Sequence, residues 1–334
     1  MAGAKARAVV AAVCWLAVLH GGHETAQAQQ AMPPSVAFPE ALPAEAAPVI
    51  LSPSLMDLSI GPAQQDVPAV GWGVNLPNYG AGGEPWTWQL LPSGVIYKAY
   101  LAAAREPRLG SQFVHMRAGG WVWDSTIGGH VGLLRYGDSS SAWPEGWQLD
   151  LEGAVFPRIA LDERRDLVAA DYRCGAPVTF RRGPLESKFG YYHVSSHLGD
   201  EFMLAHPAAL PIHFTRDSLV WGVAVRPRDS LRLYAEADWS FHNDGGSKPW
   251  QFQFGVDYSP AEPSRLAPFL ALNSRLREDV DFSGNLTVQA GLQWRGQGGQ
   301  LLRLGAHYFN GLSDQAQMFR DFEEQIGLGV WYDF

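Results

Sequence analysis

Alternating apolar and polar residues fill successive segments of about ten residues, from about residue 111 to the end of the 334-residue chain. In residues 284–295 the apolar positions are Leu286, Val288, Ala290, Leu292 and Trp294, and the positions between them are Thr287, Gln289, Gly291, Gln293 and Arg295. Neighbouring side chains of a strand point to opposite faces, so one face is apolar and the other polar. Long strands with aromatic residues at the ends of the apolar face are typical of lipid-facing strands. The pattern predicts an all-β protein, an antiparallel transmembrane β-barrel with a short N-terminal extension.

The number and spacing of the segments support a barrel. About twelve are predicted, and bacterial barrels have an even number of strands. They lie near residues 112–122, 127–136, 147–157, 167–180, 185–196, 217–226, 230–241, 250–258, 266–274, 284–295, 300–310 and 324–334. In the C-terminal half, short links such as "RRGP" and "PRD" alternate with longer ones such as "GDEFMLAHPAALPIHF". This alternation is expected of short periplasmic turns and longer external loops.

Composition agrees with this fold and excludes one class of partner. The chain has 13 Trp, 11 Tyr and 16 Phe, but charged residues make up only 18%. Aromatic-rich chains with few amphipathic helices are typical of β-proteins. The net charge is −9 and no block of Lys and Arg is present, so a nucleic-acid partner is not expected. The predicted partner of the apolar face is outer-membrane lipid.

The N-terminal third of the chain is predicted to precede the barrel. Residues 1–28 contain a short basic stretch, an apolar run and the sequence Ala-Gln-Ala, which predicts a secretory signal peptide and export to the bacterial outer membrane. Residues 29–70 are rich in Pro and Ala and are predicted to be flexible. Residues 71–110 are predicted to form an N-terminal cover segment, and residues 111–334 the barrel. The mature chain keeps one cysteine, Cys174, so no intramolecular disulfide is expected.

The last strand ends in an aromatic residue. Ile326, Leu328, Val330, Tyr332 and Phe334 alternate with smaller or polar residues, apart from Trp331, and Phe334 is the last residue given. This ending resembles the sorting signal of outer-membrane barrels, which implies recognition of Phe334 by the barrel-insertion machinery. If the C-terminus is periplasmic, the predicted strand 185–196 runs outward.

A histidine and a serine share one face near the external end of that strand. His193 and Ser195 lie in phase with Leu185, Phe189 and Tyr191, so both are predicted to face lipid at the level of the headgroups. Polar groups on the lipid face are costly except near the interface. Asp217 opens the next strand in phase with its apolar face and could orient His193.

Three stretches of the chain carry a family resemblance. They are "LPSGVIYKAYLAAAREPRLG" (91–110), "YYHVSSHLGDEFM" (191–203) and "RDSLVWGVAVRP" (216–227). The chain resembles an uncharacterised family of outer-membrane barrels, domain of unknown function 1207. This resemblance implies a fold and no activity.

The His-x-Ser element also resembles the catalytic element of outer membrane phospholipase A and of lipid A deacylases. That resemblance implies His193 as general base, Ser195 as nucleophile and Asp217 as the group that orients the imidazole. It further implies calcium as a cofactor, which Asp200 and Glu201 could bind through carboxylate oxygens. The phospholipase pattern continues with Asn and Gly after the serine, whereas this chain continues with Ser196 and His197.

Three functions follow as alternatives. The chain is predicted to be an outer-membrane barrel with a structural or envelope-associated role, a lipid-acting serine hydrolase, or a narrow channel. The polar residues predicted to face the lumen could either fill it or line a solute path. They are Arg232, Glu236, Asp238, Gln251, Gln253, Asp257, Gln289, Gln293 and Arg295.

Overall fold

The structure is a computed structural model that describes residues 84–263 and 265–334. The predicted signal peptide and the Pro/Ala-rich segment lie outside these described residues, as does the first part of the predicted cover segment. Within the described ranges, no helix is long and apolar enough to cross a membrane.

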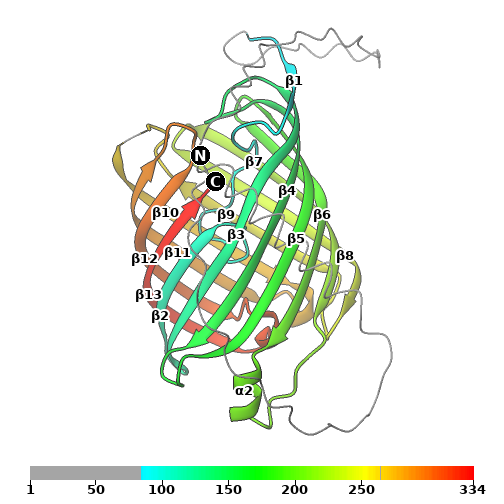
Figure 1. Cartoon of the computed structure of the whole chain (residues 1–334), viewed down its shortest axis with the longest axis vertical. Helices are drawn as coiled ribbons and strands as arrows, with labels where there is room; N and C mark the ends of the chain where they lie inside the picture. The colour runs from blue at the N-terminus through cyan, green and yellow to red at the C-terminus, as the bar shows by residue number, and fades with distance from the viewer. Residues whose placement is uncertain (1–83, 264) are drawn as a thin grey trace, which may run out of the picture. The chain divides into compact units, whose positions relative to one another are not determined.

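The described chain folds into a closed ring of twelve antiparallel strands (Figure 1). Each strand pairs with its sequence neighbours, and β13 pairs with β2, which closes the ring. The strands are β2 (Leu109–Met116), β3 (Gly120–Gly137), β4 (Gly146–Ala160), β5 (Asp166–Arg182), β6 (Leu185–Leu198), β7 (Thr215–Arg228), β8 (Leu231–Asp244), β9 (Trp250–Tyr258), β10 (Leu266–Arg277), β11 (Gly284–Arg295), β12 (Leu301–Leu312) and β13 (Phe322–Asp333). A short strand, β1 (Thr87–Leu90), pairs with the far end of β3 outside the ring.

The prediction of a twelve-stranded antiparallel barrel is confirmed. The division between the first two predicted strands was wrong, because the first, 112–122, contains a turn, and residues 123–126, predicted as a link, lie within β3. The structure places this turn at residues 117–119, between β2 and β3. Gly120 follows it with φ of 73°, a left-handed conformation that glycine adopts without strain. The apolar pattern runs through the turn, so periodicity alone did not reveal it.

The two ends of the ring differ in their connections. One end, here called the turn end, has two-residue turns at 183–184 and 229–230, and β13 ends there. The other end, here called the α2 end, carries the connection 199–214 with the helix α2 (Asp200–Ala205). It also carries the short 3-10 helices η1 (Glu278–Val280) and η2 (Ala316–Met318). Short turns at one end and a long loop at the other match the periplasmic and external ends of bacterial barrels.

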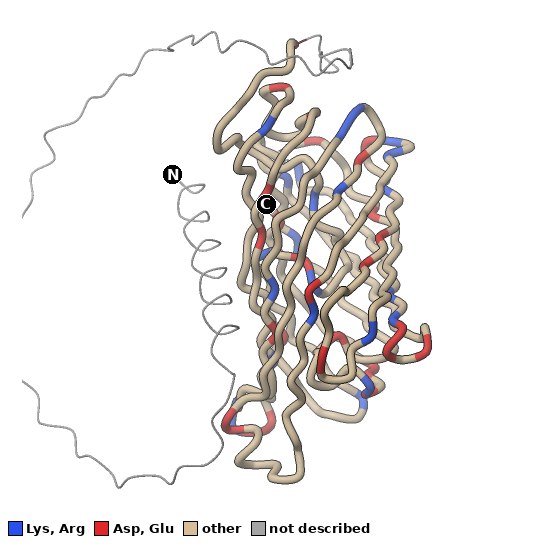
Figure 2. Tube along the Cα trace, turned by 90° about the vertical axis from the view of Figure 1, so that its right-hand side faces the viewer, with Lys and Arg blue, Asp and Glu red and all other residues tan. Residues whose placement is uncertain are grey.

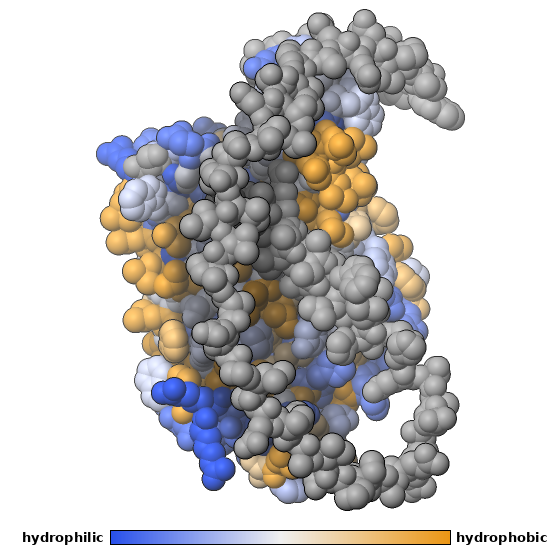
Figure 3. Space-filling view, viewed as in Figure 1, coloured by the Kyte–Doolittle hydropathy of each residue, from blue (hydrophilic) through white to orange (hydrophobic). Residues whose placement is uncertain are grey.

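The outer face of the ring is apolar. Phe189, Trp221 and Leu328 are 56%, 60% and 65% exposed, although such residues are normally buried in soluble proteins. In Figure 3, orange apolar side chains lie between blue polar ones on the left side of the barrel. Aromatic residues are exposed near both ends of the strands: Trp147, Tyr258 and Trp294 at the turn end, and Trp121, Trp250 and Phe322 at the α2 end. This arrangement is an apolar band between two aromatic girdles.

The inner face is polar and many of its charges are paired. Arg158 contacts Asp124 at 2.7 Å and Glu323 at 2.6 Å, and Lys188 contacts Glu236 at 2.6 Å. Figure 2 shows Lys, Arg, Asp and Glu positions along the strands as well as in the loops. The nine predicted lumen residues alternate with outward-facing apolar residues, and six of them are buried: Arg232, Gln251, Asp257, Gln289, Gln293 and Arg295.

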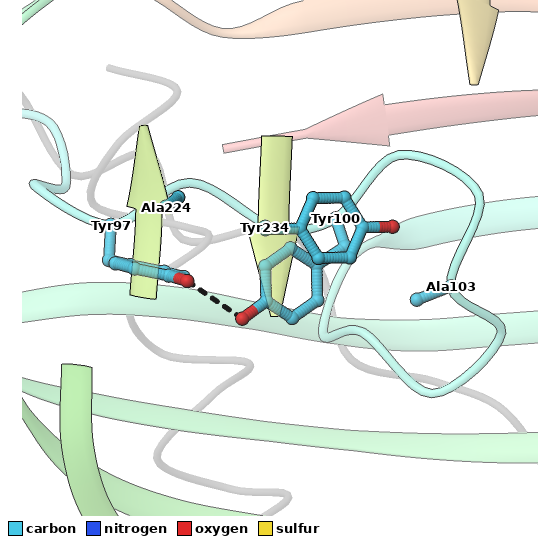
Figure 4. Close-up of a cluster of buried hydrophobic side chains, with 5 residues drawn as sticks. All are labelled: Tyr97, Tyr100, Ala103, Ala224 and Tyr234. Atoms are coloured by element: carbon cyan, nitrogen blue, oxygen red, sulfur yellow. Dashed lines mark hydrogen bonds between the residues drawn. The ribbon is translucent and has the colours of Figure 1, made fainter. Parts of the chain in front are cut away.

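Residues 91–108, here called the lumen segment, lie inside the ring and fall within the predicted cover segment. Tyr100 stacks on Tyr234 of β8 with ring centroids 3.9 Å apart, and its hydroxyl lies 2.7 Å from that of Tyr97 (Figure 4). The same hydroxyl donates to Glu236 at 3.0 Å. A Cβ at Gly222 of β7 would lie 2.8 Å from the Tyr100 hydroxyl, so a glycine there leaves room for the segment.

Arginines fix the backbone of the lumen segment. Arg303 of β12 donates to the carbonyl of Leu101 at 3.1 Å, and Arg232 of β8 donates to that of Lys98 at 2.9 Å. Arg108 donates to the carbonyls of Leu101 and Tyr100 and contacts Asp333 of β13 at 3.0 Å. A segment without regular secondary structure can lie inside a barrel only if its polar groups are bonded in this way.

We expect Phe254→Arg to destabilise the barrel in lipid. Phe254 is the fifth of the nine residues of β9 and is 44% exposed, so it lies near the middle of the apolar band. An arginine facing the bilayer midplane costs about 2–4 kcal/mol. The measurement is urea unfolding in phospholipid vesicles. Phe254→Leu and Leu204→Arg, the latter in the exposed helix α2, are the controls and should shift the midpoint little. An unchanged midpoint for Phe254→Arg would contradict a lipid-facing β9.

We also expect the barrel to be silent in planar bilayer recordings. The lumen cavity on the α2 side, lined by Arg105, Tyr192, Arg216 and Arg275 among others, has a volume of about 70 Å³, which holds only a few water molecules. Replacing residues 91–107 by a Gly/Ser chain of equal length removes every anchoring side chain of that stretch. This variant should show discrete conductance steps. Equal conductance in the two proteins would show that the lumen segment does not block the barrel.

Candidate functional site

His193, Ser195 and Asp217 all lie on the outer face of the barrel near the α2 end. In β6 the exposed residues Leu185, Phe189 and Tyr191 alternate with the buried residues Glu186, Lys188 and Tyr192. His193 and Ser195 continue the outward set. In β7, Asp217 is in phase with the exposed residues Leu219, Trp221 and Val223. The strand phases are therefore those that the alternation predicted.

The structure brings His193 and Asp217 together. They are directly opposite each other in the register of β6 and β7, and Nδ1 of His193 lies 2.8 Å from Oδ1 of Asp217. The side chains are 17% and 19% exposed. A carboxylate only accepts hydrogen bonds, so Nδ1 is the donor, and a neutral imidazole in this arrangement has its lone pair on Nε2. Nε2 is buried and has no hydrogen-bond partner among the described residues.

Asp217 accepts two further side-chain hydrogen bonds. The hydroxyl of Tyr191 donates to Oδ1 at 2.5 Å, and Nδ1 of His242 lies 2.9 Å from Oδ2. Charge-assisted bonds of this kind are stronger than those between neutral groups. The carboxylate is therefore held in one orientation by three neighbours, and it holds the imidazole of His193 in turn.

Sequence reasoning missed the role of His242. The alternation in β8 placed His242 on the polar inner face, together with Arg232 and Ser240. The structure has an irregular register between β7 and β8: Asp217 is opposite His242, but Ser218 is opposite Ser240. The extra residue, Phe241, shifts the phase, so both Phe241 and His242 face outward. A β-bulge has this effect on side-chain direction, and no turn residue in the sequence marks it.

Ser195 lies on the same face as His193 but makes no hydrogen bond to it among the described residues. Ser195 is opposite Tyr172 of β5 and Thr215 of β7, and its side chain is partly buried. Residues two apart on a strand point the same way, so a rotation of the serine side chain is the movement that would bring the two groups together. Hydrogen bonds of catalytic groups are often long before substrate binds.

Cys174 is a second residue that the sequence analysis did not place near the site. It lies on β5 directly opposite His193, on the side away from Asp217. Cys174, His193, Asp217 and His242 therefore form a row across β5, β6, β7 and β8. These residues are far apart in the sequence, and only the register of three strand pairs reveals the row.

The predicted calcium ligands are not joined to this row. Asp200 and Glu201 form the first turn of α2 and are exposed. Among residues 84–263 and 265–334, no group of three His, Cys, Asp or Glu side chains is arranged to hold a metal ion. Calcium binding by Asp200 and Glu201 stays a prediction.

The arrangement can support proton transfer at the barrel surface. His193, oriented by a carboxylate through Nδ1, can accept a proton at Nε2, and a hydroxyl and a thiol-bearing residue flank it. A nucleophile, a base and an orienting acid on one face are the elements of acyl transfer. The neighbouring residues Phe189, Leu219 and Trp221 are exposed, so the surface beside these groups is apolar.

Several solved barrels are similar to this chain at low sequence identity. Outer membrane phospholipase A from Escherichia coli is 10% identical, with a TM-score of 0.47; 69% of this chain and 95% of that chain are covered. The Salmonella typhi outer membrane phospholipase dimer with bound calcium is also 10% identical, with a TM-score of 0.47; 67% of this chain and 90% of that chain are covered. A KdgM porin is 10% identical, with a TM-score of 0.38; 68% of this chain and 99% of that chain are covered. These likenesses say nothing about the activity of this chain.

The comparison with curated protein sequences finds no match. The model of the family described as "Protein of unknown function (DUF1207)" matches residues 85–334, which include the lumen segment and all twelve strands of the ring. This chain, a closed β-barrel, therefore belongs to the DUF1207 family.

Proposed function

We propose that this barrel is a serine hydrolase that cleaves an ester bond of a membrane lipid at its outer surface. The observation that supports the proposal best is the 2.8 Å contact between His193 Nδ1 and Asp217 Oδ1 on the lipid-facing side, with Ser195 on the same face. A histidine–carboxylate pair is costly to place on a lipid face. Its position near the α2 end, at the level of the headgroups, lowers this cost and gives access to lipid esters.

The proposed reaction follows from the proton positions. Nε2 of His193 takes the proton of the Ser195 hydroxyl while the serine oxygen attacks the ester carbonyl. The imidazolium, stabilised by Asp217, then gives this proton to the departing alcohol. A water molecule hydrolyses the acyl-serine by the same transfer in reverse, which releases the fatty acid. Ser195 must rotate towards Nε2 when substrate binds, because the two groups are not hydrogen-bonded in the structure.

The surroundings of the site favour lipid over a soluble ester. Below His193 on the outer face lie Phe189, Trp221 and Leu219, which are exposed side chains in the apolar band. An acyl chain of a bilayer lipid would lie along these residues, with its ester group near the polar row at the α2 end. If this end is external, the substrate belongs to the outer leaflet.

Conduction through the barrel is the less favoured function. The lumen segment crosses the interior and is bonded to β3, β8, β9 and β12 through Arg135, Arg232, Asp257 and Arg303. The polar lumen residues are thus used to hold protein rather than to line a solute path. A filled lumen suits a barrel that acts through its outer surface.

We expect Ser195→Ala and His193→Ala each to reduce hydrolysis to the background rate, because each removes a group that bonds to the reacting atoms. Asp217→Asn should reduce the rate about 10²–10⁴-fold, the usual contribution of general acid–base catalysis. The assay is fatty-acid release, measured by mass spectrometry, from glycerophospholipid and from lipopolysaccharide in mixed micelles. It is run with and without calcium.

Ser187→Ala is the matched control. Ser187 faces outward on the same strand and only accepts a bond from Trp221 Nε1 at 3.3 Å. Its loss should leave the rate unchanged. Folding of each variant is checked by its heat-modifiable mobility on SDS gels. Hydrolysis that persists in folded Ser195→Ala and His193→Ala, or that is absent from the wild type on both lipids, would rule out this proposal.

A further inference from the structure

A cluster of positive charges lies inside the barrel at the turn end. Lys98 of the lumen segment, Arg181 of β5, Arg226 of β7, Arg232 of β8 and Arg295 of β11 contribute to it. The indole of Trp143, in the loop between β3 and β4, lies against three of the guanidinium groups. Its ring centroid is 5.3 Å from Arg181, 4.6 Å from Arg226 and 5.1 Å from Arg295. Cation–π contacts therefore gather these side chains at one place.

A small cavity opens among these residues. Lys98, Trp143, Arg226, Arg232, Ser259 and Arg295 are among the residues that line it, and its volume is about 30 Å³. This space holds one or two water molecules or a small ion. The cavity lies between the lumen segment and the loops at the turn end, far along the barrel from His193, so it is independent of the proposed hydrolase site.

The carboxylates near the cavity do not balance its positive charge. The carboxylate of Glu186 pairs with two guanidinium groups, that of Arg226 at 2.5 Å and that of Arg232 at 3.0 Å. The carboxylate of Asp257 lies 3.9 Å from the guanidinium group of Arg232. Asp333, which also lines the cavity, is bound by Arg108 at 3.0 Å and by Arg303 at 2.8 Å.

Three cations of the cluster have no carboxylate of their own. Across residues 84–263 and 265–334, no carboxylate oxygen lies within 4.0 Å of a charged nitrogen of Lys98, Arg181 or Arg295. Uncompensated charges in the interior are unfavourable, so an anion placed among these groups would be stabilised.

Two buried donors have no partner. Nζ of Lys98 and Nη2 of Arg232 are buried without a hydrogen bond in the described part of the chain. Arg232 is only 2% exposed, and both residues line the cavity. Nearly all buried donors in native proteins are bonded, so each exception needs an explanation. An acceptor with several oxygens, placed in the cavity, would satisfy both donors at once.

The protonation of Lys98 is sensitive to the same charges. Burial, together with the guanidinium groups of Arg295, Arg226 and Arg181, lowers the pKa of Lys98 to about 7, and Glu186 opposes this effect. The ordinary pKa of a lysine is about 10.4. An anion beside Lys98 would favour its charged form and raise this pKa. Anion binding above pH 7 would therefore take up a proton.

We infer that the cavity binds a phosphate group, either inorganic phosphate or the phosphate end of a small monoester. Three guanidinium groups and a lysine ammonium that line one cavity match the charge and the several acceptor oxygens of phosphate. The turn end corresponds to the periplasmic side, so the ligand would enter from the periplasm. Bound phosphate would also link the lumen segment, through Lys98, to β8 and β11.

The test is isothermal titration calorimetry of the full chain, refolded in detergent, with inorganic phosphate at constant ionic strength. We expect saturable binding of about one phosphate per chain. Lys98→Met and Arg295→Gln should each weaken it at least tenfold. Arg117→Gln removes a charge at the α2 end, where Arg117 is 82% exposed, and should change nothing. No saturable binding, or equal binding by folded Lys98→Met and Arg295→Gln, would overturn the inference.

A second measurement needs no variant. Titrations of the wild type at pH 7.5 in buffers of different ionisation enthalpy should show net proton uptake by the protein, and affinity should be higher at pH 6.5 than at pH 8.5. Because phosphate itself titrates near pH 7, sulfate is titrated in parallel as an anion of constant charge. Sulfate binding with no proton uptake would contradict a site that contains Lys98.

Two further titrants distinguish the source of the phosphate. Glycerol 3-phosphate tests a soluble monoester, and phosphatidic acid in mixed micelles tests a lipid headgroup. A cavity inside the barrel should admit the soluble ester and exclude the lipid. Binding of phosphatidic acid alone would contradict a site inside the lumen.

Discussion

Hydrogen bonding of the backbone in a hydrocarbon solvent is the constraint on which the rest of this structure depends. No water is available there to bond a free amide or carbonyl, so an open sheet edge is not tolerated. The pairing of β13 with β2 removes both edges and lets the apolar side chains face lipid. It also encloses the polar side chains in a lumen where lipid does not reach them.

The filled lumen is the second consequence of closure. A ring of twelve strands encloses more space than its inward side chains occupy, and the lumen segment takes up the remainder. The segment is held by arginines of the strands, which donate to its carbonyls, and by Tyr100, which fits beside Gly222 of the wall. The inward-facing polar side chains, which would line the path of a solute in a channel, hold the lumen segment here. The lumen is therefore a polar core, and the molecule presents its chemistry at its outer face and at its ends.

The two candidate sites follow from different physical situations. On the outer face, His193 and Asp217 are polar groups that lipid would destabilise, and they occur together near the end of the apolar band, where one bonds the other. At the turn end, Lys98 and its neighbouring arginines are charges that the protein leaves unbalanced. The first arrangement is suited to proton transfer and the second to binding an anion. Neither needs the other, since they lie at opposite ends of the barrel.

Period-two hydrophobicity by itself determined the barrel, most strand boundaries and the face of most residues, because apolar side chains that face lipid alternate with polar side chains that face the lumen. It therefore placed His193, Ser195 and Asp217 outward. The bulge at Phe241 escaped it because no turn residue marks it, and the turn at 117–119 escaped it because the alternation continues through this turn, although Gly119 and Gly120 are of a residue type common in turns. Only the tertiary structure decided which side chains of different strands are neighbours. The row from Cys174 to His242 depends on the registers of three strand pairs, and the lumen segment and the Lys98 cluster depend on contacts between residues more than a hundred positions apart. Such contacts form because closure of the ring brings distant strands around one interior, and no local pattern in the chain encodes their distances.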